Sequence, residues 1–352
     1  MKTRTLPAPT TPRFEPDADP AQITDAVAVL RRHSHNPSAF LAVNQQTRHF
    51  RSPDVDGLIA YRPAGRRHLV QLGGVFASDP DQPALLSAFL AAARRGGRRV
   101  VAVQLQRGDA ELYAAHGFTV NQLGASYARS LEGFRLAGGP FMKLRNKISR
   151  ARRAGVRVLE VGVDAPADPR LGRRLAAIDA AWLRGKGSRA KELAFLVGER
   201  GGPADGERRL FVAAKDDQPL AYISFSPVFG RHAGWLHDLT RRLPDAPPGV
   251  MELIVVTAME RFRNEGAGHF HFGFTPFTSL DARHELPQAF SRAAATAVGF
   301  LARHGAAVYP AEDQVAYKLK WAPDLIEPDY IGFQAGVSLP AIWQLLRLTR
   351  AV

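Results

Sequence analysis

Short β-type and helix-type patterns of apolar residues alternate along most of this 352-residue chain. In its first part, apolar residues recur at helical spacing over residues 23–32, 84–95 and 109–116. Runs rich in β-branched and aromatic residues, bounded by turn residues, predict strands over residues 39–43, 57–62, 68–72 and 99–104, from Phe118 onward, and over residues 126–131. The segment from Gly73 to Pro83 is expected to be irregular.

The same order of elements returns in the second part without a detectable sequence repeat. Helices are predicted over residues 169–184, 250–265 and 289–304, and strands over residues 156–161, 210–215, 221–228, 234–239, 269–274, 316–321 and 329–334. An amphipathic helix over residues 339–350 closes the pattern, with Arg347 and Arg350 beside a broad apolar face. We expect this helix to pack on the second domain or to lie on an anionic membrane.

A basic helix is predicted between the two parts, over residues 141–155. Phe141, Leu144, Ile148 and Ala151 form one apolar stripe, and cations cover the remainder. These cations are Lys143, Arg145, Lys147, Arg150, Arg152 and Arg153. A charged helix face is often only a solvated surface, but this density also suits contact with a polyanion such as RNA.

The stretch Gly234–Phe277 combines a strand, a proline-rich turn, a helix and a second strand. Pro244, Pro247, Pro248 and Gly249 cannot continue regular structure, so the helix begins just after them. A helix N-terminus favours anions and polarised oxygens. The pattern therefore predicts a polar cluster at this helix entrance. Its expected members are Asp238, Arg241, Arg242 and Glu252.

Composition narrows the functional classes. There are 47 Lys and Arg against 33 Asp and Glu, a net charge of +14, which attracts nucleic acid or anionic membrane. The absence of cysteine excludes disulfides, zinc–thiolate sites and thiol nucleophiles. No apolar run reaches the roughly 18–20 residues of a membrane span. We expect a cytoplasmic protein with a disordered, proline-rich tail over residues 1–20, and peripheral contact with the inner membrane surface as an open alternative.

The element order resembles that of acetyltransferase-like (GNAT) α+β domains, in which a phrase such as Leu112–Phe118 (LYAAHGF) is common. We therefore expect an α+β fold of two tandem GNAT-like domains joined by the basic helix. The expected organisation is a tail over residues 1–20, a first domain over 21–137, a linker helix over 138–155, a second, catalytic domain over 156–337 and a terminal amphipathic helix over 338–352.

Three segments resemble the C-terminal catalytic domain of the phosphatidylglycerol lysyl/alanyl-transferases, the multiple peptide resistance factor family. They are GWLHDLTRRLPDAPPGVMEL, with the strand HFHFGFTPF that follows its helix, FMKLRNKISRARRAG, and AYKLKWAPDLIEPDYI. The resemblance extends over roughly residues 23 to 335. It implies an enzyme that takes an amino acid from aminoacyl-tRNA and places it on a hydroxyl or amine. The basic helix would then contact tRNA.

The resemblance leaves the acceptor open between two classes. The best-known members place the amino acid on phosphatidylglycerol and carry many transmembrane helices before this domain, and no comparable apolar segments occur in this sequence. Some soluble relatives serve natural-product pathways and use a small amine or hydroxylamine as acceptor. Both acceptors suit this chain.

Aminoacyl-tRNA is an activated ester, so we expect neither cofactor nor metal. Asp238 and Glu252 are the candidate base and ligand of the α-amino group; alternatively they only cap a turn and complement a helix dipole. Arg241 and Arg242 suit tRNA phosphates or the ester carbonyl, or a structural pair with Asp245. Lys318 and Lys320 are predicted to share one face of strand 316–321, which either faces solvent or binds an anion, and the resemblance implies the anion for Lys318. The remaining expected substrate-binding residues are Trp235, Phe274, Thr275 and Tyr317.

The histidines provide little evidence of function. His237, His269 and His271 have no carboxylate at ligand spacing, so we interpret them as structural or surface residues and not as a metal site. Two other functions stay open: an acyl-CoA N-acyltransferase on the same fold, and a non-enzymatic protein that binds RNA or a membrane surface. The proline-rich turn, which replaces the glycine-rich turn of an acetyl-CoA site, argues against the first.

Overall fold

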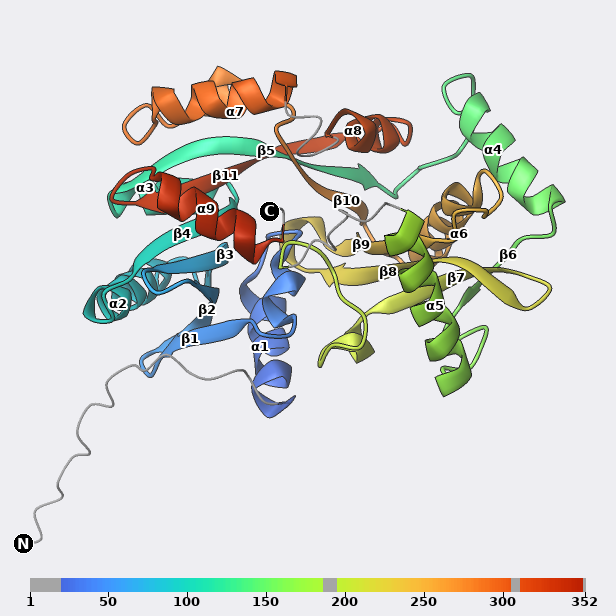
Figure 1. Ribbon diagram of the computed structural model, residues 1–352, viewed down its shortest axis with the longest axis horizontal. Helices are drawn as coiled ribbons and strands as arrows, with labels where there is room; N and C mark the ends of the chain where they lie inside the picture. The colour runs from blue at the N-terminus through green and yellow to red at the C-terminus, as the bar shows by residue number, and fades with distance from the viewer. Residues whose placement is uncertain (1–19, 186–194, 305–310, 351–352) are drawn as a thin grey trace, which may run out of the picture.

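A computed structural model describes residues 20–185, 195–304 and 311–350, and all eleven strands in these residues form one continuous sheet (Figure 1). The strand order is β1-β2-β3-β4-β11-β5-β10-β9-β8-β7-β6. The strands are β1 Arg48–Ser52, β2 Val55–Ala64, β3 His68–Ala77, β4 Arg99–Leu105, β5 Phe118–Ser130, β6 Arg157–Glu160, β7 Arg209–Lys215, β8 Gln218–Val228, β9 Gly234–Arg242, β10 His269–Pro276 and β11 Leu325–Gln334. The predicted mixed α+β fold is confirmed.

Nine α-helices lie within the described residues and cover both faces of the sheet (Figure 1). They are α1 Pro20–His33, α2 Gln82–Arg95, α3 Arg107–Ala115, α4 Met142–Arg153, α5 Pro169–Gly185, α6 Val250–Asn264, α7 Arg292–His304, α8 Ala311–Leu319 and α9 Leu339–Leu348. Short 3-10 helices occur at Ala39–Val43, Asp205–Glu207, Gly230–His232 and Ala282–His284. Except for Pro20, the predicted tail lies outside the described residues.

The two halves of the chain are joined within the sheet. β5 pairs with β10 of the second half from Ser130 opposite His269 to Gly124 opposite Pro276. β11, from the end of the chain, returns to the first half and lies between β4 and β5. Backbone hydrogen bonds across these pairs hold the halves in one layer.

Each half contains one pair of parallel strands that starts together and then separates. β3 pairs with β4 from His68 opposite Arg99 to Leu72 opposite Val103. β9 pairs with β10 over three residues only, from Gly234 opposite His269 to Leu236 opposite His271. Helix α2 follows β3 and helix α6 follows β9, so each opening between separated strands lies beside a helix N-terminus.

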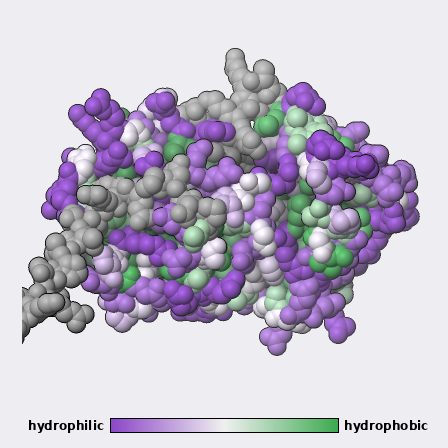
Figure 2. Space-filling view, turned by 90° about the horizontal axis from the view of Figure 1, so that it is seen from below, coloured by the Kyte–Doolittle hydropathy of each residue, from purple (hydrophilic) through white to green (hydrophobic). Residues whose placement is uncertain are grey.

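Apolar clusters lie on both faces of each half. In the first half, α2 and α3 cover one face, and α1 and α9 cover the other. In the second half, α4 and α6 cover one face, where Phe225 packs edge-on against Phe211 and Phe262 with ring centroids 5.5 and 5.2 Å away. The opposite face packs against α5. In the view of Figure 2 the visible surface is mostly hydrophilic, with small separate hydrophobic areas.

Several sequence predictions of elements are confirmed, among them α2, α4, α6 and the β8–β9 hairpin. Others are wrong. Residues 39–43 form a 3-10 helix whose five residues are all buried, β3 continues through Gly73–Ala77, and Phe118–Ser130 is one long strand. α9 packs chiefly on β2 and β3 of the first half, in an apolar cluster that also contains Ile331 and Phe333 of β11.

The predicted strand at 316–321 is also wrong, because these residues lie mostly in helix α8 and in the turn after it. Glu312 and Asp313 in the first turn of α8 complement the helix dipole. The short alternation YKLK is compatible with either a helix or a strand. Lys318 and Lys320 therefore do not share a strand face.

Candidate active site

The separation of β9 from β10 creates the opening around which the predicted site residues are placed. Beyond Leu236 and His271 the two strands no longer pair. The chain leaves β9, passes through the turn over residues 243–249, and enters α6 beside this opening. Helix α8 packs on β10. Backbone groups that parallel pairing would have satisfied must find other partners here.

Lys318 satisfies two of these backbone groups. Its side chain is buried, and its Nζ donates hydrogen bonds to the carbonyl oxygens of Gly273 at 2.6 Å and Phe274 at 3.1 Å. Burial lowers the pKa of Lys318 to about 7, although the charge of Asp329 acts in the opposite direction. A lysine amine at the edge of this opening therefore carries a readily exchanged proton near neutral pH.

Asp329 in β11 is a buried acid whose charge interacts with that of Lys318. Burial raises its pKa to about 7, and the charge of Lys318 opposes this increase. No local pattern singles out Asp329, although it lies in the closing segment EPDYI. Its importance depends on β11 entering the sheet between β4 and β5, which the local pattern does not show.

Glu252 occupies the first turn of α6 and forms the centre of a charged cluster. Its Oε1 accepts a hydrogen bond from Lys320 Nζ at 2.7 Å, and the Glu252 side chain is only 9% exposed. Lys320 Nζ also lies 3.9 Å from the ring centroid of Tyr317. Burial alone would raise the pKa of Glu252, but the hydrogen bond and charge of Lys320 outweigh it, and the pKa is lowered.

Helix α4 reaches this cluster directly. Lys147 Nζ lies 3.7 Å from Glu252 Oε1. Gly249, which precedes α6, has φ +91°, and a Cβ there would lie 2.0 Å from the carbonyl oxygen of Lys147. Glycine permits both this left-handed conformation and the close approach of the two backbones. The basic helix thus packs against the helix entrance.

The predicted tRNA-binding cations are mostly on the solvent side of α4. Lys143, Lys147, Arg150, Arg152 and Arg153 are exposed, while Leu144, Ile148 and Ala151 are buried. Arg145 differs, because its guanidinium donates to the carbonyl of Gly138 at 2.7 Å and fixes the segment before the helix. The predicted apolar stripe is confirmed.

Asp238 lies away from Glu252, in a buried network between the halves. The Ser226 hydroxyl donates to Asp238 Oδ2, and Arg208 Nε lies 3.8 Å from the same oxygen. Arg208 in turn donates to Asn44 Oδ1 of the first half at 2.5 Å. The side chains of Arg208 and Asp238 are each 3% exposed. Burial raises the pKa of Asp238, and the charge of Arg208 acts against this increase.

Arg241 and Arg242, adjacent in β9, have different surroundings. Arg241 is buried on the α5 side, where its guanidinium lies 4.1 Å from the ring centroid of Trp182 and its Nε lies 3.8 Å from Asp179. Arg242 is exposed. Within the described ranges, Arg241 thus forms an ion pair with Asp179, which was not a predicted site residue, and none is seen with Asp245.

The remaining predicted pocket residues divide between core and opening. Trp235 stacks on Phe262 at 5.2 Å on the α6 side. Phe274 and Tyr317 are half-buried near Lys318 and Lys320. Thr275 is fully buried, and its hydroxyl has no hydrogen-bond partner among the described residues. The structure therefore groups Glu252 with Lys320 and Tyr317, and Lys318 with the backbone of Phe274 in β10. Tyr317 and Lys318 are neighbours in α8, which connects the two groups, whereas Asp238, Arg241 and Trp235 lie in other surroundings.

The histidines are explained by packing. The ring of His237 contacts Phe225, Phe270 and Tyr317, and burial lowers its pKa to about 3. His271 Nε2 hydrogen bonds with the carbonyl of His232 at 2.7 Å. Within the described ranges of the chain, no three His, Asp or Glu side chains are grouped to hold a metal ion. In the same ranges, no helix has the length and apolar character that crossing a membrane requires.

This arrangement has the groups that acyl transfer from an activated ester uses. A carboxylate can bind the ammonium of an amino acid, a lysine with a pKa near neutrality can exchange a proton, and further lysine and arginine side chains can stabilise negative oxygen. No step of such a transfer requires a cofactor.

Comparison with known proteins identifies the family. Residues 27–333 match the family model for the C-terminal region of phosphatidylglycerol lysyltransferase. The chain is 29% identical over 234 residues to the lysylphosphatidylglycerol biosynthesis bifunctional protein LysX of Mycolicibacterium vanbaalenii, covering 64% of this chain and 21% of that protein. It is 25% identical over 272 residues to the phosphatidylglycerol lysyltransferase of Bacillus subtilis, covering 76% of this chain and 30% of that protein. The chain thus spans less than a third of either relative's length.

Solved structures share the fold over nearly the whole chain. The structure of L-PGS from Bacillus licheniformis has a TM-score of 0.77 at 23% identity, covering 96% of this chain and 99% of that one. The C-terminal domain of a putative lysylphosphatidylglycerol synthetase from Agrobacterium fabrum has a TM-score of 0.73 at 23% identity, covering 95% and 97%. The resemblance predicted from the motifs is confirmed, and the chain belongs to the family of phosphatidylglycerol lysyltransferase C-terminal domains.

Proposed function

We propose that this chain transfers an aminoacyl group from aminoacyl-tRNA to an acceptor hydroxyl or amine at the β9–β10 opening. The observation that carries the proposal is the contact between α4 and the entrance of α6. It puts a row of exposed cations beside a cluster of half-buried ionisable groups. A polyanion on α4 would thus have one end close to Glu252, as the acceptor end of a charged tRNA requires.

In the proposed reaction, the acceptor oxygen or nitrogen attacks the carbonyl carbon of the aminoacyl ester. A bond from the acceptor to this carbon forms, and the bond from the carbon to the ribose oxygen of tRNA breaks. The acceptor proton passes to the ribose oxygen through a protein group. We assign this transfer to neutral Lys318, whose pKa of about 7 suits both steps near neutral pH.

The other residues of the opening hold the donor in the proposed complex. Glu252 binds the α-ammonium of the amino acid, which replaces the Lys320 ammonium as the hydrogen-bond donor to Glu252 Oε1. Lys320, thus released, and exposed Arg242 face the oxygen that becomes negative and the 3′ phosphates of tRNA. Phe274 and Tyr317 form the walls. Asp238 and Arg241 act at a distance, by fixing β9 against the first half and against α5.

For the acceptor we propose phosphatidylglycerol, in agreement with the names of the family and of the Bacillus subtilis relative. The surface of α9 supports contact with an anionic membrane. Leu339 is 82% exposed and Trp343 is 53% exposed. Gln344 of α9 lies against Gly65, which brings exposed Arg66 and Arg67 beside the helix. Apolar side chains flanked by cations bind such membranes.

A transfer assay with separated arms tests this function. The purified chain receives tRNA charged with a mixed pool of labelled amino acids, and either phosphatidylglycerol vesicles or a soluble hydroxylamine. We expect label in the lipid fraction and loss of transfer after ribonuclease treatment. Transfer only to the soluble amine would reject the lipid acceptor. Transfer that survives ribonuclease, or that proceeds from acetyl-CoA instead, would reject the donor.

A further inference from the structure

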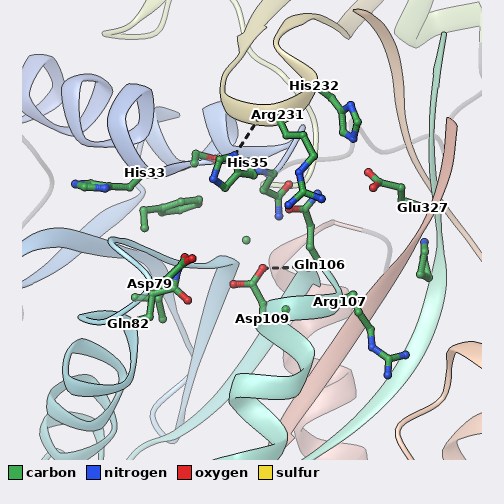
Figure 3. Close-up of a pocket in the computed structure, with 17 residues that line it drawn as sticks. His33, His35, Asp79, Gln82, Gln106, Arg107, Asp109, Arg231, His232 and Glu327 are labelled. Carbon is green, nitrogen blue, oxygen red and sulfur yellow. Dashed lines mark hydrogen bonds between the residues drawn. The ribbon is translucent and has the colours of Figure 1, made fainter. Parts of the chain in front are cut away.

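The opening between β3 and β4 in the first half contains a cavity that the proposed transfer reaction does not use. It has a volume of about 310 Å³ and lies between the ends of α1 and β3, the start of α3, and the Gly230–His232 helix (Figure 3). This volume is sufficient for a small metabolite. The cavity and the candidate active site occupy equivalent positions in the two halves. Each lies beside a pair of parallel strands that separate.

The charges around this cavity are divided between its sides. Arg231, His35 and His232 enter from one side, and Asp79 and Asp109 enter from the opposite side, with Glu327 beside His232 (Figure 3). Among the described residues, Arg231 forms no ion pair with any of these carboxylates. The cavity therefore separates charges of opposite sign without letting them neutralise one another.

Other cations near the cavity are already engaged. The guanidinium of Arg107 points away from the cavity, and its Nε lies 2.6 Å from Glu111 (Figure 3). His33 pairs with Asp56 at 3.0 Å. Arg231 is thus the cation directed at the cavity.

The floor of the cavity is fixed by buried polar contacts. Asn36 donates to the carbonyl of Gln104 at 2.7 Å. Asp109 accepts the backbone N–H of Gln106 at 3.1 Å, and burial raises the pKa of Asp109 to about 7. A Cβ on Gly74 would lie 2.0 Å from Asp109 Oδ1, so glycine there lets the backbone approach the carboxyl group. This side of the cavity is built before any ligand binds.

The cavity also joins the two halves of the chain. The backbone N–H of Arg231 donates to His35 Nδ1 at 3.1 Å. A Cβ on Gly230 would lie 2.1 Å from the same nitrogen. A ligand held by Arg231 and by first-half residues would add a second connection at this point.

We propose that this cavity binds a small zwitterion with one carboxylate and more than one ammonium group, that is, a free basic amino acid. The carboxylate pairs with Arg231, and the ammonium groups pair with Asp79 and Glu327. Asp79 and Glu327, which form no ion pair among the residues that the structure describes, outnumber the single directed guanidinium, and Asp109 lies on the side of Asp79. Arg231 and Asp79 are exposed and Glu327 is half-buried, so water hydrates these charges before a ligand binds. A ligand with charges of both signs can pair with both sides of the cavity, whereas a purely anionic or a purely cationic ligand would be repelled by one side.

Equilibrium dialysis with labelled L-lysine tests this proposal without tRNA or acceptor. It uses the full chain carrying Glu252→Gln, so that the candidate active site does not contribute. In this background we expect one bound lysine per chain, and a loss of affinity of at least tenfold with either Arg231→Ala or Glu327→Gln. Arg94→Ala, at an exposed arginine in the last turn of α2, is the matched control and is expected to change nothing.

Competing ligands test the charge pattern. Glycerol 3-phosphate, 1,4-diaminobutane and L-alanine are expected to displace lysine at least tenfold less well than lysine itself. No lysine binding at millimolar concentration, binding that survives both cavity substitutions, or equal displacement by any of the three would overturn the proposal. Because the assay contains no tRNA, a failure of the transfer reaction leaves its result unaffected.

Discussion

Lys147 Nζ of α4 lies 3.7 Å from Glu252 Oε1 of α6, which joins the basic helix to the candidate active site. Lys147 is 57% exposed, whereas Glu252 is 9% exposed, so the pair connects solvent with the buried cluster. An RNA phosphate bound to Lys147 would weaken the ion pair between Lys147 and Glu252. Donor binding and the charge of the site are thus coupled through one contact.

The exposed face of α4 should determine how tRNA binding depends on salt. We expect the triple substitution of Arg150, Arg152 and Arg153 by Gln to weaken binding and to reduce the slope of log affinity against log salt. The reduction should be roughly two to three, since each lost phosphate contact removes about 0.7–0.9. Filter binding over a salt series measures this slope. Replacing exposed Arg94, Arg95 and Arg99 in the first half is the control, and an equal loss there would show that only net charge matters.

Gly249 should be much less replaceable than Gly266, although both have positive φ. Alanine at Gly266, with φ +86° and nothing within 4 Å, should lower the free energy of unfolding by about 1 kcal/mol from backbone strain. Alanine at Gly249 also meets the Lys147 carbonyl, so we expect a loss of about 2–5 kcal/mol. Denaturant unfolding compares the two. Equal losses would mean that α4 does not pack on α6 as described.

Asp238 should support the fold more than the chemistry. Asp238→Asn leaves buried Arg208 with the partly exposed Asp205, 3.3 Å away, as its remaining charge partner, and we expect a loss of about 1–3 kcal/mol in the free energy of unfolding. Asp245→Asn, on the exposed turn after β9, should have almost no effect. Thermal unfolding measures both. If Asp238→Asn kept full stability but abolished transfer, Asp238 would be the base and Lys318 would not.

Transfer should depend on pH through Lys318. Its pKa is lowered from 10.5 to about 7, so the rate should fall as pH falls below 7 and the amine takes up a proton. Between pH 7 and pH 10.5 the unfolded chain holds this proton and the folded chain does not. Lys318 therefore lowers the free energy of unfolding by an amount that is largest below pH 7 and decreases as pH rises through this window.

Asp329→Asn tests whether the pH dependence of transfer comes from Lys318 or from another ionisable group. The charge of Asp329 raises the pKa of Lys318, so its removal should move the inflection of the rate to lower pH. Single-turnover rates between pH 5.5 and 8.5 measure the inflection. Glu312→Gln, at the exposed start of α8, should leave it unchanged. An inflection that stays in place in Asp329→Asn would remove Lys318 from the proposed proton transfer.

The sequence predicted the elements with strong periodicity and the motifs beside them. α4, α6 and the β8–β9 hairpin have clear patterns and clear stop residues, and Glu252 followed from its place in the first turn of α6. The motifs are also sufficient to identify the family by resemblance. These features depend on residues close together in the chain.

The features that the sequence did not predict depend on pairing between distant parts of the chain. β11 enters the sheet between β4 and β5, which brings Asp329 to Lys318 and could not be deduced from the local pattern. Asp238 followed a strand motif, but its surroundings come from Arg208 and Asn44, in two other parts of the chain. The YKLK segment alternates like a strand, yet packing on β10 selects a helix there.

The central claim is that transfer occurs beside Glu252, and one measurement tests it most directly. Single-turnover transfer from labelled lysyl-tRNA to phosphatidylglycerol vesicles is followed for the unsubstituted chain, Glu252→Gln and Glu260→Gln. Glu260 lies on the same helix but is exposed. We predict that Glu252→Gln slows transfer by roughly 100-fold or more with tRNA affinity kept within about threefold, and that Glu260→Gln has no effect. Equal transfer rates in all three proteins would contradict this location for the active site.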